Sequence, residues 1–205
     1  TYDPRMLKLW AVVGLPGDAV RADELYARAR AAGMRVPPGR IVYTQWLNDR
    51  AGIEADLTIT RLSEREYMVV TSAICQTRDL AWLRRAIEAQ PDAHCTVTDV
   101  TSGIAMLGVM GPRSRELLQT VSGADLSNDA HPFGHSREIE IGYARVRASR
   151  ITYVGELGWE LYLPAEHCLD VYERLLEAGA PLGMKLAGYH AMGACRVEKG
   201  YKHWS

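Results

Sequence analysis

The segment IVYTQWLNDRAGIEADLTITRL, residues 41–62, decides how the middle of this sequence folds. Over residues 41–47, β-branched, aromatic and polar side chains alternate between two faces, which predicts a strand. The turn-forming cluster Asn48–Gly52 follows, and a second strand is predicted over 56–62. A third strand over 67–71, reached through a polar turn, completes an antiparallel meander.

The flanking sequence adds helices and further strands. Helices are predicted over residues 19–32, 77–90, 113–121, 165–178 and 186–200. Further strands are predicted over residues 96–101, 105–109, 137–143, 146–154 and 159–163, the first two paired around Ser102-Gly103. Because consecutive strands follow one another without crossovers, we expect an α+β fold with mostly antiparallel sheets and packed helices. The blocks 41–90 and 95–121 share one layout, so we expect two similar strand–helix subdomains.

Composition excludes several classes of protein. Of the 205 residues, 47% are hydrophobic and 24% are charged, which is the balance of a folded globular chain rather than a disordered one. With 24 Lys and Arg against 25 Asp and Glu, the net charge is −1, and no basic excess indicates a nucleic-acid partner. No apolar run reaches the length of a membrane span, and the N-terminus lacks a signal-peptide cleavage site.

Cysteine and histidine patterns do not indicate a metal site. The four cysteines lie far apart in the sequence without zinc-ligand spacing, as expected of free thiols in a reducing compartment, so we expect a cytoplasmic protein. His131 and His135 lie four residues apart, but within a loop containing Pro and Gly. They therefore share no helical face, and we expect solvated histidines there rather than metal ligands.

Two carboxylates lie in predicted strands. Strands disfavour Asp, so Asp56 either makes a local turn hydrogen bond or serves a ligand. In the strand 159–163, Trp159 and Leu161 share one face, while Glu160 and Tyr162 share the other. Glu160 is accordingly either a solvent-facing residue or a ligand-binding one.

Four segments of the chain, in order, resemble the folate-binding aminomethyltransferases, the family of the glycine cleavage T-protein. These segments are Tyr43–Leu57, Gly108–Ser114, Arg150–Leu161 and Ala187–Trp204. The last resembles, in particular, the folate domain that follows the FAD domain in dimethylglycine and sarcosine dehydrogenases. The resemblance covers residues 36–205 and implies an aminomethyltransferase-like folate-binding domain there. Residues 1–35 resemble the family poorly and are interpreted as a divergent N-terminal segment.

The resemblance implies a tetrahydrofolate site and assigns residues to it. Asp56, as the catalytic residue, falls where the family places a carboxylate beside N10 of tetrahydrofolate. Glu160 falls where a glutamate receives the amino and ring N–H groups of the pterin, a pairing that suits a carboxylate. Tyr43 and Tyr153 match tyrosines that line the site, and Thr71 falls at the position of a site-lining Asn.

The implied reaction is one-carbon transfer. Tetrahydrofolate attacks an iminium released by amine oxidation, which gives 5,10-methylenetetrahydrofolate, and the protein contributes mainly by holding the reactants together. Because the sequence has no FAD domain, the resemblance implies an FAD-dependent amine dehydrogenase as partner.

Several departures from the family pattern keep a second interpretation open. Ala55 replaces the first Asp of the usual pair, and Met192 stands where the T-protein has an arginine. The family continues into a small C-terminal β-barrel, whereas this sequence ends at Ser205, so the domain is expected to lack that barrel and to be incomplete. The alternative is a catalytically inactive, truncated folate-binding or protein-interaction module.

Two further expectations follow from the resemblance. A folate-dependent demethylase of the same fold is a third interpretation, in which the segment 122–136 decides the substrate. Without a covering barrel, Tyr189, Tyr201 and Trp204 are expected to leave apolar surface uncovered, which favours a homo-oligomer or a docked partner.

Overall fold

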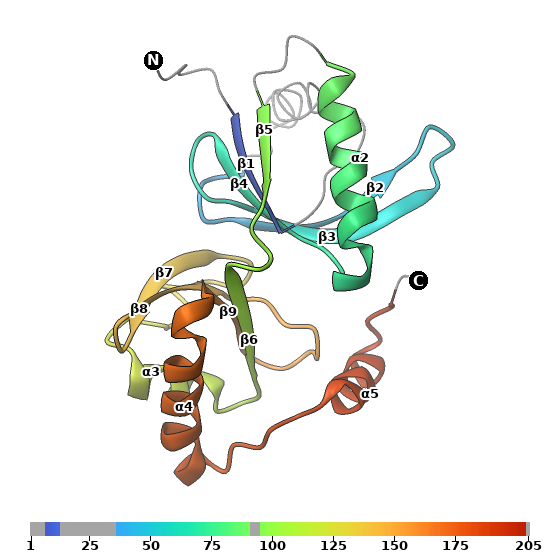
Figure 1. Ribbon diagram of the computed structural model, residues 1–205. Helices are drawn as coiled ribbons and strands as arrows, with labels where there is room; N and C mark the ends of the chain where they lie inside the picture. Colours follow the sequence, from blue (N-terminus) through green and yellow to red (C-terminus); the bar gives the residue numbers. More distant parts are fainter. Residues whose placement is uncertain (1–6, 13–35, 91–94, 204–205) are drawn as a thin grey trace, which may run out of the picture. The chain divides into compact units, whose positions relative to one another are not determined.

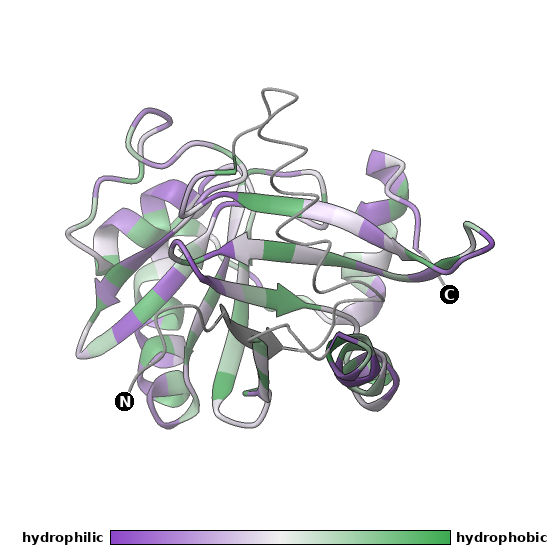
Figure 2. Cartoon of the chain, turned by 90° about the horizontal axis from the view of Figure 1, so that it is seen from above, coloured by the Kyte–Doolittle hydropathy of each residue, from purple (hydrophilic) through white to green (hydrophobic). Residues whose placement is uncertain are grey.

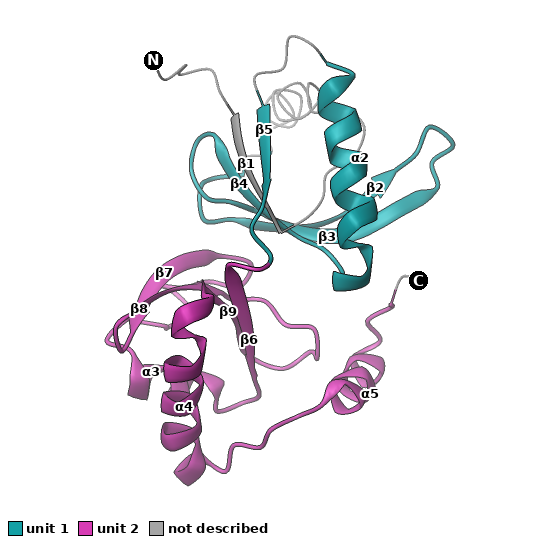
Figure 3. Cartoon of the chain, viewed as in Figure 1, with its two compact units in different colours: residues 1–101 teal, residues 102–205 magenta. Residues whose placement is uncertain are grey.

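The computed structural model describes residues 36–90 and 95–203, together with the backbone of residues 7–12. The chain divides into two compact units, residues 1–101 and 102–205, and each has its own sheet (Figures 1 and 3). The helix predicted over 19–32 lies outside the described residues.

The sheet of the first unit has the strand order β2-β3-β4-β1-β5. Its elements are β1 (Leu7–Val12), β2 (Ile41–Leu47), β3 (Ile53–Arg61), β4 (Glu66–Val70), the 3-10 turn η1 (Ala73–Cys75), α2 (Gln76–Glu88) and β5 (Cys95–Asp99). The predicted meander is confirmed, because β3 pairs antiparallel with both β2 and β4. Strand β1, which the sequence analysis did not predict, pairs parallel with both β4 and β5.

Helix α2 covers one face of this sheet. Ala55, Leu57 and Val69 project from the strands toward that side and are buried. Leu83 of α2 packs into the same cluster and is only 1% exposed. Strand residues between these positions, Asp56 among them, therefore belong to the opposite face.

The sheet of the second unit is antiparallel throughout, in the order β6-β9-β8-β7. Its elements are β6 (Ile104–Met110), α3 (Ser114–Val121), β7 (Ser136–Ile141), β8 (Ala144–Ser149), β9 (Gly158–Pro164), the 3-10 turns η2 (Ala165–His167) and η3 (Ala180–Leu182), α4 (Cys168–Gly179) and α5 (Tyr189–Lys199).

One face of this second sheet forms a closed core with two helices. Figure 2 shows hydrophobic and hydrophilic residues interspersed along the strands of the chain. In the second sheet, the central strand β9 contributes Trp159 and Leu161, both fully buried. Leu118 of α3 and Val171 of α4 pack into the same cluster. Glu160 consequently lies on the face of the sheet that is turned away from α3 and α4.

The predicted pairing of the strands around Ser102-Gly103 is wrong. Strand β5 pairs with β1, whereas β6 pairs with β9, so the turn at Ser102 connects two sheets. Burial explains this outcome, because Val97 packs into the core of the first unit and Val109 into that of the second. The predicted block 95–121 is therefore divided between the two units, whose boundary falls at 101/102.

Two smaller corrections concern the second unit. The strand predicted over 146–154 ends at Ser149, so Tyr153 lies in the connection before β9. Within the described residues, no helix combines the length and apolar character that a membrane crossing requires.

Candidate functional site

Tyr43 and Asp56 form a pair on the face of the first sheet that lies opposite α2. Asp56 is directly across from Gln45, so Tyr43 is its diagonal neighbour on β2. The Tyr43 hydroxyl donates to Oδ2 of Asp56 at 2.7 Å. The interaction that holds Asp56 is thus a cross-strand bond rather than a local turn bond. Tyr43 is 61% exposed.

Thr71 is bound to α2 and does not contact this pair. Its Oγ1 donates to Oδ2 of Asp79 at 2.7 Å, and Nε of Arg78 donates to the other carboxylate oxygen at 2.8 Å. Asp79 is 2% exposed, so the carboxylate joins the end of β4 to the start of α2. The sequence analysis missed Asp79, although its spacing from Leu83 and Ala86 is that of a buried helix face.

Glu160 lies on the central strand of the second sheet, beside Tyr162. The Tyr162 hydroxyl donates to Oε2 of Glu160 at 2.5 Å. Burial raises the pKa of Glu160, although the bond from Tyr162 acts in the opposite direction. Burial and the neighbouring carboxylate raise the pKa of Tyr162 well above 10, so this hydroxyl keeps its proton and remains a donor. The sequence analysis placed Tyr162 on the same face but gave it no role.

Tyr153 lies half-buried in the connection between β8 and β9, in the same unit as Glu160. This connection turns at Gly155, whose φ is +77°. The Lys199 side chain at the end of α5 lies against the turn, so close that a Cβ at residue 155 would be 2.4 Å from its Cγ. The connection and the end of α5 therefore pack together.

The expectation of a solvated His131 is wrong, because this side chain is 1% exposed. Its Nδ1 accepts from the indole N–H of Trp159 at 3.4 Å, and its Nε2 lies 3.1 Å from the His135 carbonyl oxygen. Burial lowers the pKa of His131 to about 4, so the ring is neutral near pH 7 and Nε2 carries the proton.

The segment 122–136 is held by arginines against the Trp159 side of the sheet. Arg115 donates to the Leu126 carbonyl oxygen, Arg150 to that of His131, and Arg137 to that of Asp125. Arg115 and Arg150 also stack against the Trp159 ring, 5.8 and 5.6 Å from its centroid. These contacts anchor the segment on the face opposite Glu160.

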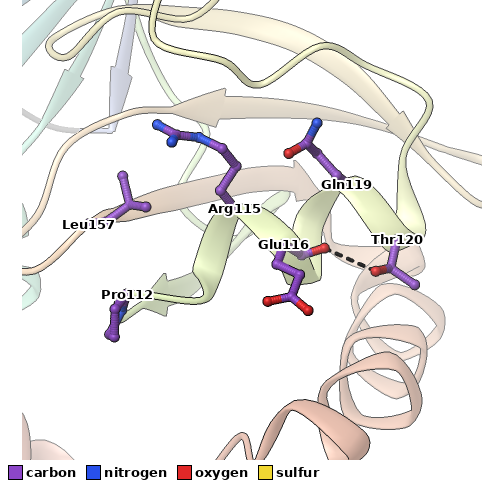
Figure 4. A pocket seen from close by; sticks show the side chains of 6 residues that line it. All are labelled: Pro112, Arg115, Glu116, Gln119, Thr120 and Leu157. Atoms are coloured by element: carbon purple, nitrogen blue, oxygen red, sulfur yellow. Dashed lines mark hydrogen bonds between the residues drawn. The ribbon is translucent and has the colours of Figure 1, made fainter.

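A hollow of about 520 Å³ lies along the outer side of α3 (Figure 4). It is lined by Pro112, Arg115, Glu116, Gln119, Thr120 and Leu157. Its charged groups already have partners, because Arg113 binds the Glu116 carboxylate and Arg115 donates to the loop. None of the expected site residues lines this hollow, and the described residues contain no cluster of three potential metal ligands.

Comparison with known proteins relates the chain to one family. Residues 20–205 match the profile of the GCVT N-terminal domain. The 4-methylaminobutanoate oxidase (formaldehyde-forming) of Paenarthrobacter nicotinovorans is 44% identical over 180 residues, which cover 88% of this chain and 22% of that protein. The mitochondrial sarcosine dehydrogenase of Mus musculus is 38% identical over 188 residues, which cover 85% of this chain and 20% of that protein.

A crystal structure of the glycine cleavage system aminomethyltransferase T from Bartonella henselae matches with a TM-score of 0.63 and 26% identity, over 80% of this chain and 42% of that one. The chain spans about a fifth of the length of the curated relatives it matches. The expected α+β aminomethyltransferase fold and the relationship to sarcosine and dimethylglycine dehydrogenases are confirmed. Because the profile match extends over residues 20–205, the chain belongs to the family of GCVT N-terminal domains.

Proposed function

We propose that this chain is a tetrahydrofolate-binding domain that transfers the one-carbon unit of an amine-derived iminium to tetrahydrofolate, which gives 5,10-methylenetetrahydrofolate and releases the amine. The observation that carries the proposal is the Glu160 carboxylate, which is short of hydrogen-bond donors. Among the described residues, Tyr162 donates to Oε2, and no donor is found for Oε1. A half-buried carboxylate in this state is suited to a ligand that brings N–H groups.

The edge of an amino-pyrimidine ring fits this requirement. It presents an amino group and a ring N–H side by side, and a carboxylate accepts both in parallel. Burial raises the pKa of Glu160, whereas donors to the charged form lower a carboxylate pKa. Binding of such a ligand should therefore lower the pKa of Glu160 and hold the residue ionised.

Asp56 is proposed as the second functional carboxylate. The Tyr43 hydroxyl holds its Oδ2, which leaves Oδ1 to orient an amine N–H or to face a developing positive charge. The exposed Tyr43 ring offers a flat apolar surface beside it. When bound, tetrahydrofolate supplies the amine nitrogens that take up the one-carbon unit.

The one-carbon donor requires an oxidation that we assign to a partner. The relatives include proteins named as an oxidase and a dehydrogenase, of which this chain matches about a fifth. We propose that an FAD-dependent amine-oxidising region or polypeptide forms the iminium and delivers it to this domain.

Calorimetric titration of tetrahydrofolate into the chain tests the binding step. Glu160→Gln removes the charge that accepts two N–H groups, each such bond being worth about 1.5–3 kcal/mol, so Kd should rise by at least about tenfold. Glu140→Gln, an exposed glutamate on the edge strand β7, is the matched control and should bind as the wild type does. Loss of binding in both variants alike would contradict a specific role for Glu160.

The transfer step is tested separately through Asp56. Asp56→Asn should slow the formation of 5,10-methylenetetrahydrofolate from formaldehyde and an amine, measured above the rate without protein, while the variant still binds tetrahydrofolate. Asp49→Asn, in the exposed β2–β3 turn, is the control. An unchanged rate in Asp56→Asn would remove Asp56 from the mechanism.

One observation favours the second candidate, a protein-interaction module. Helix α5 buries none of its residues within the described chain. Tyr189 is 70% exposed and Val197 is 63% exposed. A folded chain that does not bind tetrahydrofolate, but associates through α5 in size-exclusion chromatography, would support this candidate over the first.

A further inference from the structure

A gap in the second sheet lies directly opposite Glu160. Gly108 on β6 is the cross-strand partner of Glu160, and it is exposed. A Cβ built on Gly108 would meet only one atom within 4 Å, the Met110 Cε at 3.9 Å. The strand thus lacks a side chain at this position, although there is room for one.

The backbone does not require glycine at this position. Positive φ angles occur at other glycines of the described chain, but not at Gly108. Glycine in the interior of a strand costs stability, because it loses more conformational freedom and packs no side chain. Such a residue commonly marks a place where a ligand or another backbone approaches closely.

The two neighbouring positions on the same face of β6 are filled. Met106 lies across from Tyr162 and is 54% exposed. Met110 lies across from Gly158, where its sulfur would be 2.1 Å from an added Cβ, so its side chain occupies the space above that glycine. The gap is therefore one side chain wide, with a methionine at either end and Glu160 across it.

The position in the sheet leaves this gap accessible. Strand β6 is at the edge of the sheet, and no other strand among the described residues pairs with it on the side of Gly108 away from β9. On the far side of Glu160, Ser149 is bonded to Ser136 and does not turn toward the carboxylate. A ligand can therefore reach the Glu160 carboxylate across the unfilled position at Gly108.

We propose that Gly108 is a ligand-contact position, whose missing side chain admits a flat, N–H-bearing ring to the Glu160 carboxylate. The inference rests on the proposed folate function and adds a specificity-determining residue to it. Methionine side chains are polarisable and make favourable contacts with aromatic rings, so Met106 and Met110, at the two ends of the gap, are suited to contact such a ring. Tyr162 acts as a positioning residue, because it fixes Oε2 and leaves Oε1 to face the ring.

The test separates folding from binding. Valine is favoured in strands, so Gly108→Val should leave the thermal midpoint unchanged or raised. The added side chain fills the gap, so Kd for tetrahydrofolate should rise by at least about tenfold, with a smaller rise for Gly108→Ala. Gly123→Val is the matched control, since Gly123 is also exposed and a Cβ there meets nothing within 4 Å.

Each outcome has one meaning. Wild-type affinity in Gly108→Val, with binding lost in Glu160→Gln, would refute the role of Gly108 and leave the folate function standing. A lowered thermal midpoint in Gly108→Val would refute the open gap. No binding of tetrahydrofolate by the folded wild type would refute the folate function itself, and this inference with it.

Discussion

Removing the Tyr162 hydroxyl should destabilise the second unit by an amount that depends on pH. Tyr162→Phe deletes the donor that lies 2.5 Å from Oε2 of Glu160, and the ring, 6% exposed, stays packed. A hydrogen bond to a charged group contributes about 1.5–3 kcal/mol. The variant loses this contribution when Glu160 is ionised. When Glu160 is protonated, the variant loses only a neutral hydrogen bond, worth about 0.5–1.5 kcal/mol.

The sign follows from the raised pKa of Glu160. The folded state holds this proton more tightly than the unfolded state does, so this group makes the fold less stable as pH rises above about 4.5. Without its donor, Glu160 should have a still higher pKa. The cost of Tyr162→Phe should therefore be smaller at low pH, where Glu160 is protonated, and rise toward about 1.5–3 kcal/mol as Glu160 ionises.

Urea denaturation followed by tryptophan fluorescence at several pH values measures this difference. The double variant Tyr162→Phe with Glu160→Gln provides the control, because the pH-dependent part of the cost should disappear when the carboxyl group is gone. A cost of Tyr162→Phe that does not increase as pH rises above about 4.5 would refute the reasoning.

Three other perturbations have defined outcomes. Asp79→Ala should lower the free energy of unfolding by about 2–3 kcal/mol in urea denaturation, because it removes the buried carboxylate that accepts from the Thr71 hydroxyl and from Arg78; a change below about 0.5 kcal/mol would be inconsistent with this anchor. Burial lowers the pKa of His131 to about 4, so the free energy of unfolding of the second unit should fall by about 3 kcal/mol as pH falls from 6.5 to 4. In His131→Gln, the free energy of unfolding should depend less on pH over this range. Gly155→Ala should lower the free energy of unfolding by at least about 1 kcal/mol, since φ is +77° and Lys199 fills the space. Lys199→Ala should restore only part of the steric cost, because the Cβ of residue 199, 2.7 Å from the added methyl carbon, remains.

Local patterns were enough to predict most of the elements. The alternation over 41–47 and the turn at Asn48–Gly52 correspond to β2 and the hairpin that follows. These features depend on neighbouring residues, which a sequence displays directly. The pairing of β5 with β1 depends instead on which core buries Val97, and no local signal carries that information. For this reason the turn at Ser102-Gly103 was interpreted as a hairpin.

The same distinction, between features that depend on neighbouring residues and features that depend on distant contacts, applies to the candidate site. Asp56 and Glu160 were selected because strands disfavour carboxylates and because their surroundings resemble a family. Their partners Tyr43 and Tyr162 lie where strand geometry places them, one across the sheet and one along the strand. The burial of Asp79 and His131 follows from contacts between distant segments, which charge and polarity alone would not predict. The sequence analysis assigned no role to Gly108, because the missing side chain becomes informative only when the residue across from it on the next strand is known.

The most direct test of the central claim, that Glu160 accepts N–H groups from tetrahydrofolate, is proton release on binding. Calorimetric titration at a series of pH values above 4.5, in buffers of different ionisation enthalpy, counts the protons exchanged. If the ligand donates to Glu160, its raised pKa falls on binding, so the wild type should release more protons than Glu160→Gln. Equal proton release by the two proteins, with equal affinity, would contradict the account.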